Sequence, residues 1–189
     1  MNYREFEDLT LSFFVLTLLF SNFELKNVPY AGIAVLLSFV FHELAHKHLA
    51  GRYGFIAYYR RWDLGIILAI IIGILSRFLT GETWIFAALG ALQIRGLYTY
   101  HDPRAFGKIA AAGPLTNLLL GVAGVALLYA LPLSGWALKV VYFTSSVNLW
   151  VAFFNLWPIP PLDGWKVMRW NVAYWAIMIG VAYTFMALL

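Results

Sequence analysis

Long apolar segments separated by short polar connections occupy most of the chain. The segments that we expect to form helices across a membrane are residues 9–23, 28–50, 64–79, 105–131, 136–157 and 170–189. Most of them are near the length of about 20 apolar residues that a helix needs to cross the roughly 30 Å hydrocarbon core of a bilayer. The pattern therefore predicts an all-α integral membrane protein with about six transmembrane helices.

The segment 83–100 departs from this pattern. It is apolar, but Gly90, Gln93, Arg95 and Gly96 interrupt it. Non-helical backbone is tolerated at membrane depth only where protein covers it or where it lines a cavity. We therefore expect a re-entrant or extended segment near residues 83–100 that packs against the rest of the protein.

Composition supports a membrane location. Of the 189 residues, 62% are hydrophobic and only 12% are charged, and the mean hydropathy is +0.78, whereas soluble domains are about 45–50% apolar. Because the connections between the apolar segments are short, we expect residues 1–189 to form a single integral-membrane domain. The chain has no cysteine, so a bound metal ion must be held by nitrogen and oxygen atoms.

The distribution of basic residues predicts the orientation in the membrane. If the N-terminus is cytoplasmic and the segment 83–100 returns the chain to that side, nine of the thirteen Lys and Arg residues lie on the cytoplasmic side. They are Arg4, Lys47, Arg52, Arg60, Arg61, Arg104, Lys108, Lys166 and Arg169. Cytoplasmic loops are enriched in such residues. We therefore expect a multi-pass protein of the cell membrane with a cytoplasmic N-terminus, in contact with the lipid bilayer and with no nucleic-acid partner.

Two histidines and a carboxylate interrupt the apolar segment 28–50. His42 and His46 are four positions apart, so on a helix they share one face and can hold one metal ion. Glu43 lies on the neighbouring face, within reach of a water bound to that ion. The run His-Glu-Leu-Ala-His is the HExxH signature of zinc enzymes, which predicts Zn²⁺ as cofactor and Glu43 as catalytic general base. The alternative is that the two histidines only hydrogen-bond to a neighbouring helix.

Asp163 is the predicted third ligand, because a catalytic zinc site usually has three protein ligands. It follows a helix break made by Pro158, Pro160 and Pro161, whereas the other carboxylates lie near predicted helix ends or in loops. A carboxylate near membrane depth is tolerated where it faces a cavity, another protein segment or an ion. The alternative is a turn residue, since Asp163 precedes Gly164 and Asp-Gly is a common turn pair.

Three motifs together resemble the site-2 protease family of intramembrane zinc metalloproteases. They are the HExxH run at residues 42–46, Gly-Pro-Leu-Thr-Asn at residues 113–117, and the N-x-x-P-x-x-P-L-D-G run at residues 155–164. The resemblance implies a zinc metalloendopeptidase that hydrolyses a peptide bond within or near a transmembrane helix of a membrane-protein substrate. It implies zinc on His42, His46 and Asp163, with Glu43 as the base.

The resemblance further implies that Asn117 and Asn155 line the active-site region. From the residues alone, each could equally be a structural hydrogen-bonder between helices. Many members of the family carry a PDZ or CBS regulatory domain, and we expect neither in these 189 residues.

A second class of function is an intramembrane metal or proton transporter, because His, Glu and Asp inside a membrane also mark ion pathways. The spacing of His42 and His46 with an adjacent base favours the protease. Many transporters consist of two repeated halves. The sequence shows no such repeat, which also favours the protease.

Overall fold

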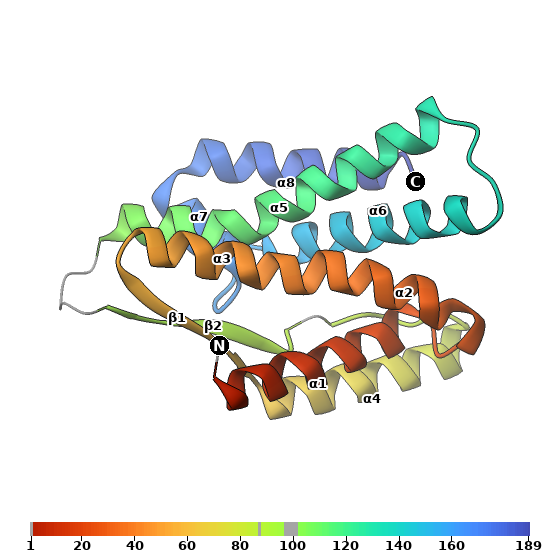
Figure 1. Cartoon of the computed structure of the whole chain (residues 1–189), viewed down its shortest axis with the longest axis horizontal. Helices are drawn as coiled ribbons and strands as arrows, with labels where there is room; N and C mark the ends of the chain where they lie inside the picture. Colours follow the sequence, from red (N-terminus) through yellow and green to blue (C-terminus); the bar gives the residue numbers. More distant parts are fainter. Residues whose placement is uncertain (1, 87, 97–101) are drawn as a thin grey trace.

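The computed structural model describes residues 2–86, 88–96 and 102–189, most of which are helical (Figure 1). The helices are α1 (Tyr3–Phe20), α2 (Val28–Val35), α3 (Phe41–Arg52), α4 (Asp63–Thr80), α5 (Pro103–Ala130), α6 (Gly135–Asn155), α7 (Asp163–Trp170) and α8 (Val172–Met186). A short 3-10 turn, η1 (Leu25–Asn27), precedes α2, and one π-helical turn, η2 (Leu36–Val40), joins α2 to α3. The segments α2, η2 and α3 therefore follow one another as a single helix that carries the HExxH run at its end.

Two strands make the all-α expectation wrong in one respect. β1 (Phe55–Arg61) and β2 (Gly90–Gly96) form a two-stranded antiparallel sheet. β2 lies within the segment 83–100, so the extended alternative is confirmed for that part, while residues 87 and 97–100 lie outside the described residues. β1 is rich in aromatic residues, which favour strands. It is short, however, and the pattern of hydrophobic residues does not distinguish it from the connections between the longer apolar segments.

Four of the described helical segments are long and apolar enough to cross a membrane. They are Leu25–Arg52, Asp63–Thr80, Pro103–Ala130 and Gly135–Asn155. Among the other predicted spans, α1 begins with charged residues, and α8 has 15 residues, which is about 22 Å at a rise of 1.5 Å per residue. The structure therefore supports a membrane protein but does not confirm the count of about six spans.

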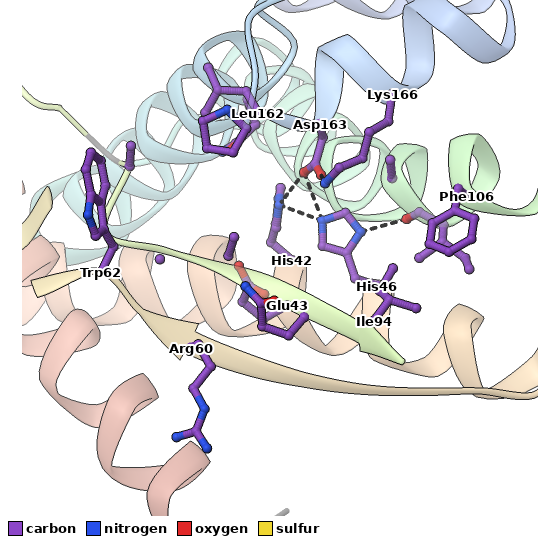
Figure 2. A pocket seen from close by; sticks show the side chains of 18 of the residues that line it. His42, Glu43, His46, Arg60, Trp62, Ile94, Phe106, Leu162, Asp163 and Lys166 are labelled. Carbon is purple, nitrogen blue, oxygen red and sulfur yellow. Dashed lines mark hydrogen bonds and ion pairs between the residues drawn. The ribbon is translucent and has the colours of Figure 1, made fainter. Parts of the chain in front are cut away.

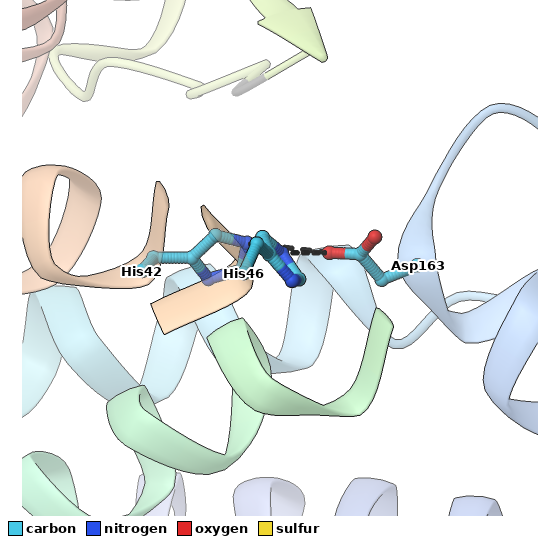
Figure 3. A group of neighbouring side chains, drawn as sticks. All are labelled: His42, His46 and Asp163. Atoms are coloured by element: carbon cyan, nitrogen blue, oxygen red, sulfur yellow. Dashed lines mark hydrogen bonds and ion pairs between the residues drawn. The ribbon is translucent and has the colours of Figure 1, made fainter. Parts of the chain in front are cut away.

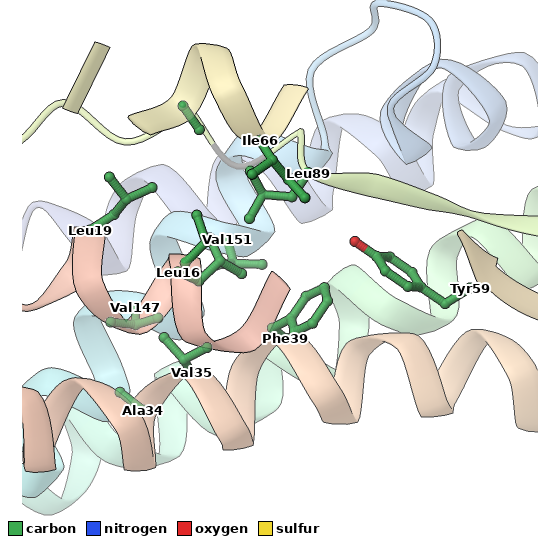
Figure 4. Packing of buried hydrophobic residues seen from close by; sticks show 12 residues of the cluster. Leu16, Leu19, Ala34, Val35, Phe39, Tyr59, Ile66, Leu89, Val147 and Val151 are labelled. Atoms are coloured by element: carbon green, nitrogen blue, oxygen red, sulfur yellow. The ribbon is translucent and has the colours of Figure 1, made fainter. Parts of the chain in front are cut away.

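Two apolar cores lie on opposite sides of α6. The first packs α1, α2, β1 and α4 together and includes Leu16 and Tyr59 (Figure 4). The second packs α5, α7 and α8 together and includes Val167. α6 contributes Val151 to the first core and Leu149 to the second, because residues two positions apart on a helix face nearly opposite directions. α6 is therefore the central helix.

Ion pairs between buried carboxylates of α1 and partly exposed basic side chains tie α1 to α3 and β1. Lys47 of α3 donates to Oε1 of Glu5 at 2.6 Å, and Arg60 of β1 donates to Oδ2 of Asp8 at 3.2 Å. Glu5 is 3% exposed and Asp8 7%. We call the region formed by β1, β2, the last turns of α3, and α7 the sheet end of the molecule. The acidic residues at the start of α1 thus hold α1 against this end.

The relative directions of the helices bring the functional segments together. Figure 1 shows α2, α3 and α6 all running toward the sheet end, whereas α4 and α5 run away from it. The extended segment that ends in β2 returns the chain to the sheet end after α4. The end of α3 and the start of α7 therefore meet at the same end of the molecule.

Candidate metal centre

Three potential metal ligands converge at the sheet end from two helices (Figure 3). His42 and His46 come from one face of α3, and Asp163 is the first residue of α7. The Nε2 atoms of the histidines are 2.9 Å apart, and Oδ2 of Asp163 lies 3.2 Å from Nε2 of His42 and 3.0 Å from Nε2 of His46. All three residues are buried. The structure thus brings together the three ligands that the sequence predicts.

Each imidazole is held through its other nitrogen. Nδ1 of His42 donates to Oδ1 of Asn117 at 2.5 Å, and Nδ1 of His46 donates to the backbone oxygen of Ile109 at 2.6 Å. Carbonyl oxygens can only accept, so each ring carries a proton on Nδ1, and in the neutral form of the ring Nε2 is the free acceptor. Histidine metal ligands are generally oriented by a hydrogen bond of this kind.

The donor atoms of the cluster fit a zinc ion. With both protons on Nδ1, the two Nε2 atoms and Oδ2 of Asp163 are three acceptors facing one small volume. Three buried acceptors repel one another unless a cation lies between them. Ligand atoms about 2.0–2.1 Å from a tetrahedral zinc are about 3.3 Å apart, close to the 2.9 to 3.2 Å observed.

The close approach of α5 to α3 depends on Gly113. A Cβ on this residue would overlap Nε2 of His46 and lie 2.6 Å from Nε2 of His42. The next residue, Pro114, has no N–H and is expected to free a carbonyl near residue 110. The neighbouring carbonyl, that of Ile109, is the one that accepts from His46. The Gly-Pro pair therefore both makes room for the histidines and lies beside the acceptor that orients one of them.

The proline-rich break places Asp163 beside the histidines. α6 ends at Asn155 and α7 begins at Asp163, as the three prolines predict. The connection folds back tightly, because a Cβ on Gly164 would overlap the backbone of Leu156. Lys166, one turn along α7, donates to Oδ1 of Asp163 at 3.4 Å, which leaves Oδ2 directed at the histidines.

A cavity of about 330 Å³ lies beside the three ligands (Figure 2). Glu43 lines it next to His42, and Figure 2 shows its side chain near β2. Oε2 of Glu43 is buried and has no hydrogen-bond partner among the described residues. This oxygen is therefore available to accept a proton in the cavity, as the predicted role of a general base requires.

The strand β2 forms one wall of the cavity and includes Gln93. Within the described sheet β2 pairs only with β1, so its second edge is not used by that sheet. Arg60 and Arg61 of β1 also line the cavity, and Figure 2 shows Arg60 extending away toward α1. The hydrogen bond from Arg61 to Asp63 raises the pKa of Arg61, so its guanidinium stays charged.

The two predicted asparagines lie at different distances from the cavity. Asn155 lines it and donates to the backbone oxygen of Val151. Asn117 is fully buried behind His42 and bonds to it directly. Asn148, whose Oδ1 accepts from Nδ2 of Asn117 at 2.9 Å, was not among the predicted site residues. Its only signal in the sequence is an amide within the apolar segment 136–157.

The fold and the site together define a class of protein. A membrane-length helical segment carries His42, Glu43 and His46, and Asp163 joins them from the short helix α7 beside one cavity. One buried oxygen of Glu43 has no hydrogen-bond partner among the described residues. This combination is typical of a metallohydrolase built into a membrane protein.

Comparison with known proteins shows the family. The chain is 38% identical over 177 residues to the protein MJ0611 of Methanocaldococcus jannaschii, which covers 93% of this chain and 88% of that protein. It is 26% identical over 171 residues to YwhC of Bacillus subtilis, covering 79% of this chain and 72% of YwhC. All of these relatives, together with Rip3 below, bear the name "Putative zinc metalloprotease". The chain therefore belongs to the zinc metalloprotease family of MJ0611.

Rip3 of Mycobacterium tuberculosis is a longer relative. It is 33% identical over 146 residues, which cover 74% of this chain and 30% of Rip3. No family model matches the chain, and no solved structure matches it.

Proposed function

We propose that the protein is an intramembrane zinc metalloprotease of the site-2 type, which hydrolyses a peptide bond within or near a transmembrane helix of a membrane-protein substrate. The observation that carries the proposal is the position of the ligand cluster. His42 and His46 lie near the end of a segment long and apolar enough to span a membrane, and Asp163 reaches them from another helix. The names of the relatives support zinc and proteolysis.

Each residue of the cluster has a defined task in this reaction. His42, His46 and Asp163 would hold Zn²⁺ through Nε2, Nε2 and Oδ2. When bound, zinc supplies a Lewis acid that polarises the scissile carbonyl and lowers the pKa of water to about 7. Glu43 accepts a proton from the attacking water and passes it to the leaving amide nitrogen. Water thereby adds its hydroxyl to the carbonyl carbon, the C–N bond breaks, and the carboxyl and amine products separate.

The walls of the cavity suggest how the substrate is held. A helical substrate hides its backbone carbonyls in its own hydrogen bonds, so the segment to be cleaved must unwind. Residues of β2 line the cavity near the ligands, and the edge of β2 that does not pair with β1 in the described sheet offers backbone partners for an extended peptide. Asn155 lines the same cavity and could bond the peptide backbone through its amide oxygen.

The proposal is tested by incubating detergent-purified protein with transmembrane-helix peptides, with and without a zinc chelator. We expect cleavage that the chelator abolishes and added zinc restores. Glu43→Gln should remove cleavage while zinc stays bound, because an amide fills the same space but does not take up the proton. Cleavage that persists at the wild-type rate in Glu43→Gln would exclude Glu43 as the base, and cleavage insensitive to the chelator would exclude a metalloprotease.

A further inference from the structure

A chain of buried hydrogen bonds runs from the backbone of α6 to the metal centre. Nδ2 of Asn148 donates to the backbone oxygen of Thr144 at 2.8 Å. Oδ1 of Asn148 accepts from Nδ2 of Asn117 at 2.9 Å, and Oδ1 of Asn117 accepts from Nδ1 of His42 at 2.5 Å. Asn117 and Asn148 are both 0% exposed, so water does not replace any of these partners.

The direction of every bond in this chain follows from its first member. The oxygen of Thr144 can only accept, so the amide of Asn148 must turn its NH₂ toward it and its oxygen toward Asn117. Asn117 then has to offer its NH₂ to Asn148 and its oxygen to His42. A carbonyl of α6, three hydrogen bonds away, thus helps to place the proton of His42 on Nδ1.

Two acceptors, the oxygens of Asn148 and Ser38, oppose the reversed orientation of the Asn117 amide. Its Nδ2 also donates to the backbone oxygen of Ser38, in the π-helical turn, at 3.0 Å. If the amide turned over, its oxygen would face the oxygens of both Ser38 and Asn148, and its NH₂ would face His42. His42 would then have to accept through Nδ1 and carry its proton on Nε2, the atom that points at the ligand cluster.

We propose that Asn148 is a positioning residue that helps to turn the amide oxygen of Asn117 toward Nδ1 of His42, so that Nε2 of the neutral ring is available to zinc. The inference rests on the proposed function, because it concerns zinc binding at that centre. Asn148 touches neither the ligand atoms nor the cavity, and acts only through Asn117. His46 needs no such relay, since its Nδ1 donates directly to a backbone oxygen, that of Ile109. The two histidines of one signature are therefore oriented by different means.

The test compares Asn148→Leu and Asn148→Ser with Ser145→Ala. Leucine removes both hydrogen bonds of Asn148 and keeps the same number of side-chain heavy atoms. Serine can still bond to the oxygen of Thr144, but it is too short to reach Asn117. Ser145 is the matched control, because it lies on the same helix, is 0% exposed, and its hydroxyl donates only to the backbone oxygen of Val141 among the described residues.

Zinc affinity is measured in detergent by competition with a chelator, and unfolding of the metal-free proteins is followed by heating. Loss of a residue that orients a zinc ligand typically weakens metal affinity 10- to 100-fold. We expect a loss of about tenfold, the low end of that range, in both Asn148 variants and less than about twofold in Ser145→Ala. If Asn148→Leu fails to fold, Asn148→Ser decides, since it retains the bond within α6. Zinc affinity of the Asn148 variants equal to that of Ser145→Ala would overturn the proposal.

A spectroscopic readout separates positioning from general destabilisation. Nitrogen-15 NMR of histidine-labelled, metal-free protein at about pH 8.5, two pH units above the ordinary histidine pKa, distinguishes protons on Nδ1 from protons on Nε2. We expect a new Nε2–H population for one histidine in the Asn148 variants and none in Ser145→Ala. An unchanged proton position would refute the inference. If the wild type bound no zinc, the proposed function would fail, while this measurement would still decide the role of Asn148.

Discussion

Replacing Gly113 by alanine should remove zinc from the protein without unfolding it. The added Cβ would overlap Nε2 of His46 and lie 2.6 Å from Nε2 of His42, whereas non-bonded atoms of this kind are normally at least about 3.5 Å apart. The two imidazoles must therefore move by roughly 1 Å each, several times the tolerance of about 0.2 Å in zinc–ligand distances. Loss of a residue that hydrogen-bonds to a metal ligand typically weakens metal affinity 10- to 100-fold. Because two ligands are displaced directly here, we expect zinc affinity to fall by more than about 100-fold.

The stability of the metal-free protein should change much less. Alanine is favoured over glycine in a helix interior by about 1 kcal/mol, which partly offsets the cost of moving the two rings. Zinc affinity is measured by chelator competition in detergent, and stability by thermal unfolding of the metal-free protein. The two readouts should therefore separate in Gly113→Ala, with affinity lost and folding retained.

Two other glycines provide controls. In Gly121→Ala, on the same helix, the new Cβ would lie 2.6 Å from Cγ of Leu149, so packing suffers away from the metal ligands. In Gly180→Ala, on α8, the Cβ meets nothing within 4 Å. We expect Gly121→Ala to lower the unfolding temperature and Gly180→Ala to change neither property. If Gly113→Ala bound zinc within about threefold of the wild type, the ligand geometry described above would be wrong.

Three further outcomes are expected. Purified protein should contain one zinc per chain by elemental analysis, and a value near zero that added zinc does not restore would contradict the metal centre. Asp163→Ala should lower zinc affinity by more than about 100-fold and abolish cleavage, and Asp163→Asn should be nearly as damaging, because each removes an anionic ligand. Asp102→Ala should change neither, since among the described residues its carboxylate accepts from the backbone N–H of Arg104, in the first turn of α5. In this chain without cysteine, Arg52→Cys should react with a membrane-impermeant thiol reagent from the cytoplasmic side and Lys26→Cys from the opposite side, and labelling of both from one side would exclude the proposed orientation.

Local pattern was sufficient for much of the candidate site. The spacing of His42 and His46 places them on one helix face whatever the rest of the chain does. The prolines before Asp163 end a helix wherever they occur, because they lack the N–H that a helix needs. The interruption of the segment 83–100 likewise predicted backbone that is not helical, and β2 was found there.

The number of spans and the sheet did not follow from the pattern. The charged residues at the start of α1 precede the predicted span 9–23, but in the structure they belong to the same helix, and Glu5 and Asp8 are buried against Lys47 and Arg60. Whether such charges are solvated or paired depends on partners more than forty positions away. A short strand such as β1 likewise gains its stability from β2 and not from its own residues.

The orientation of the zinc ligands was decided by tertiary structure alone. The signature predicts which residues bind the metal, but not which nitrogen of each ring is free to do so. That choice depends on Asn117, 75 positions from His42, and on the oxygen of Ile109, 63 positions from His46. It also requires a glycine at position 113 so that α5 can approach. Helix periodicity acts over a few residues, whereas hydrogen-bond partners and close backbone contacts exist only after distant helices have packed together.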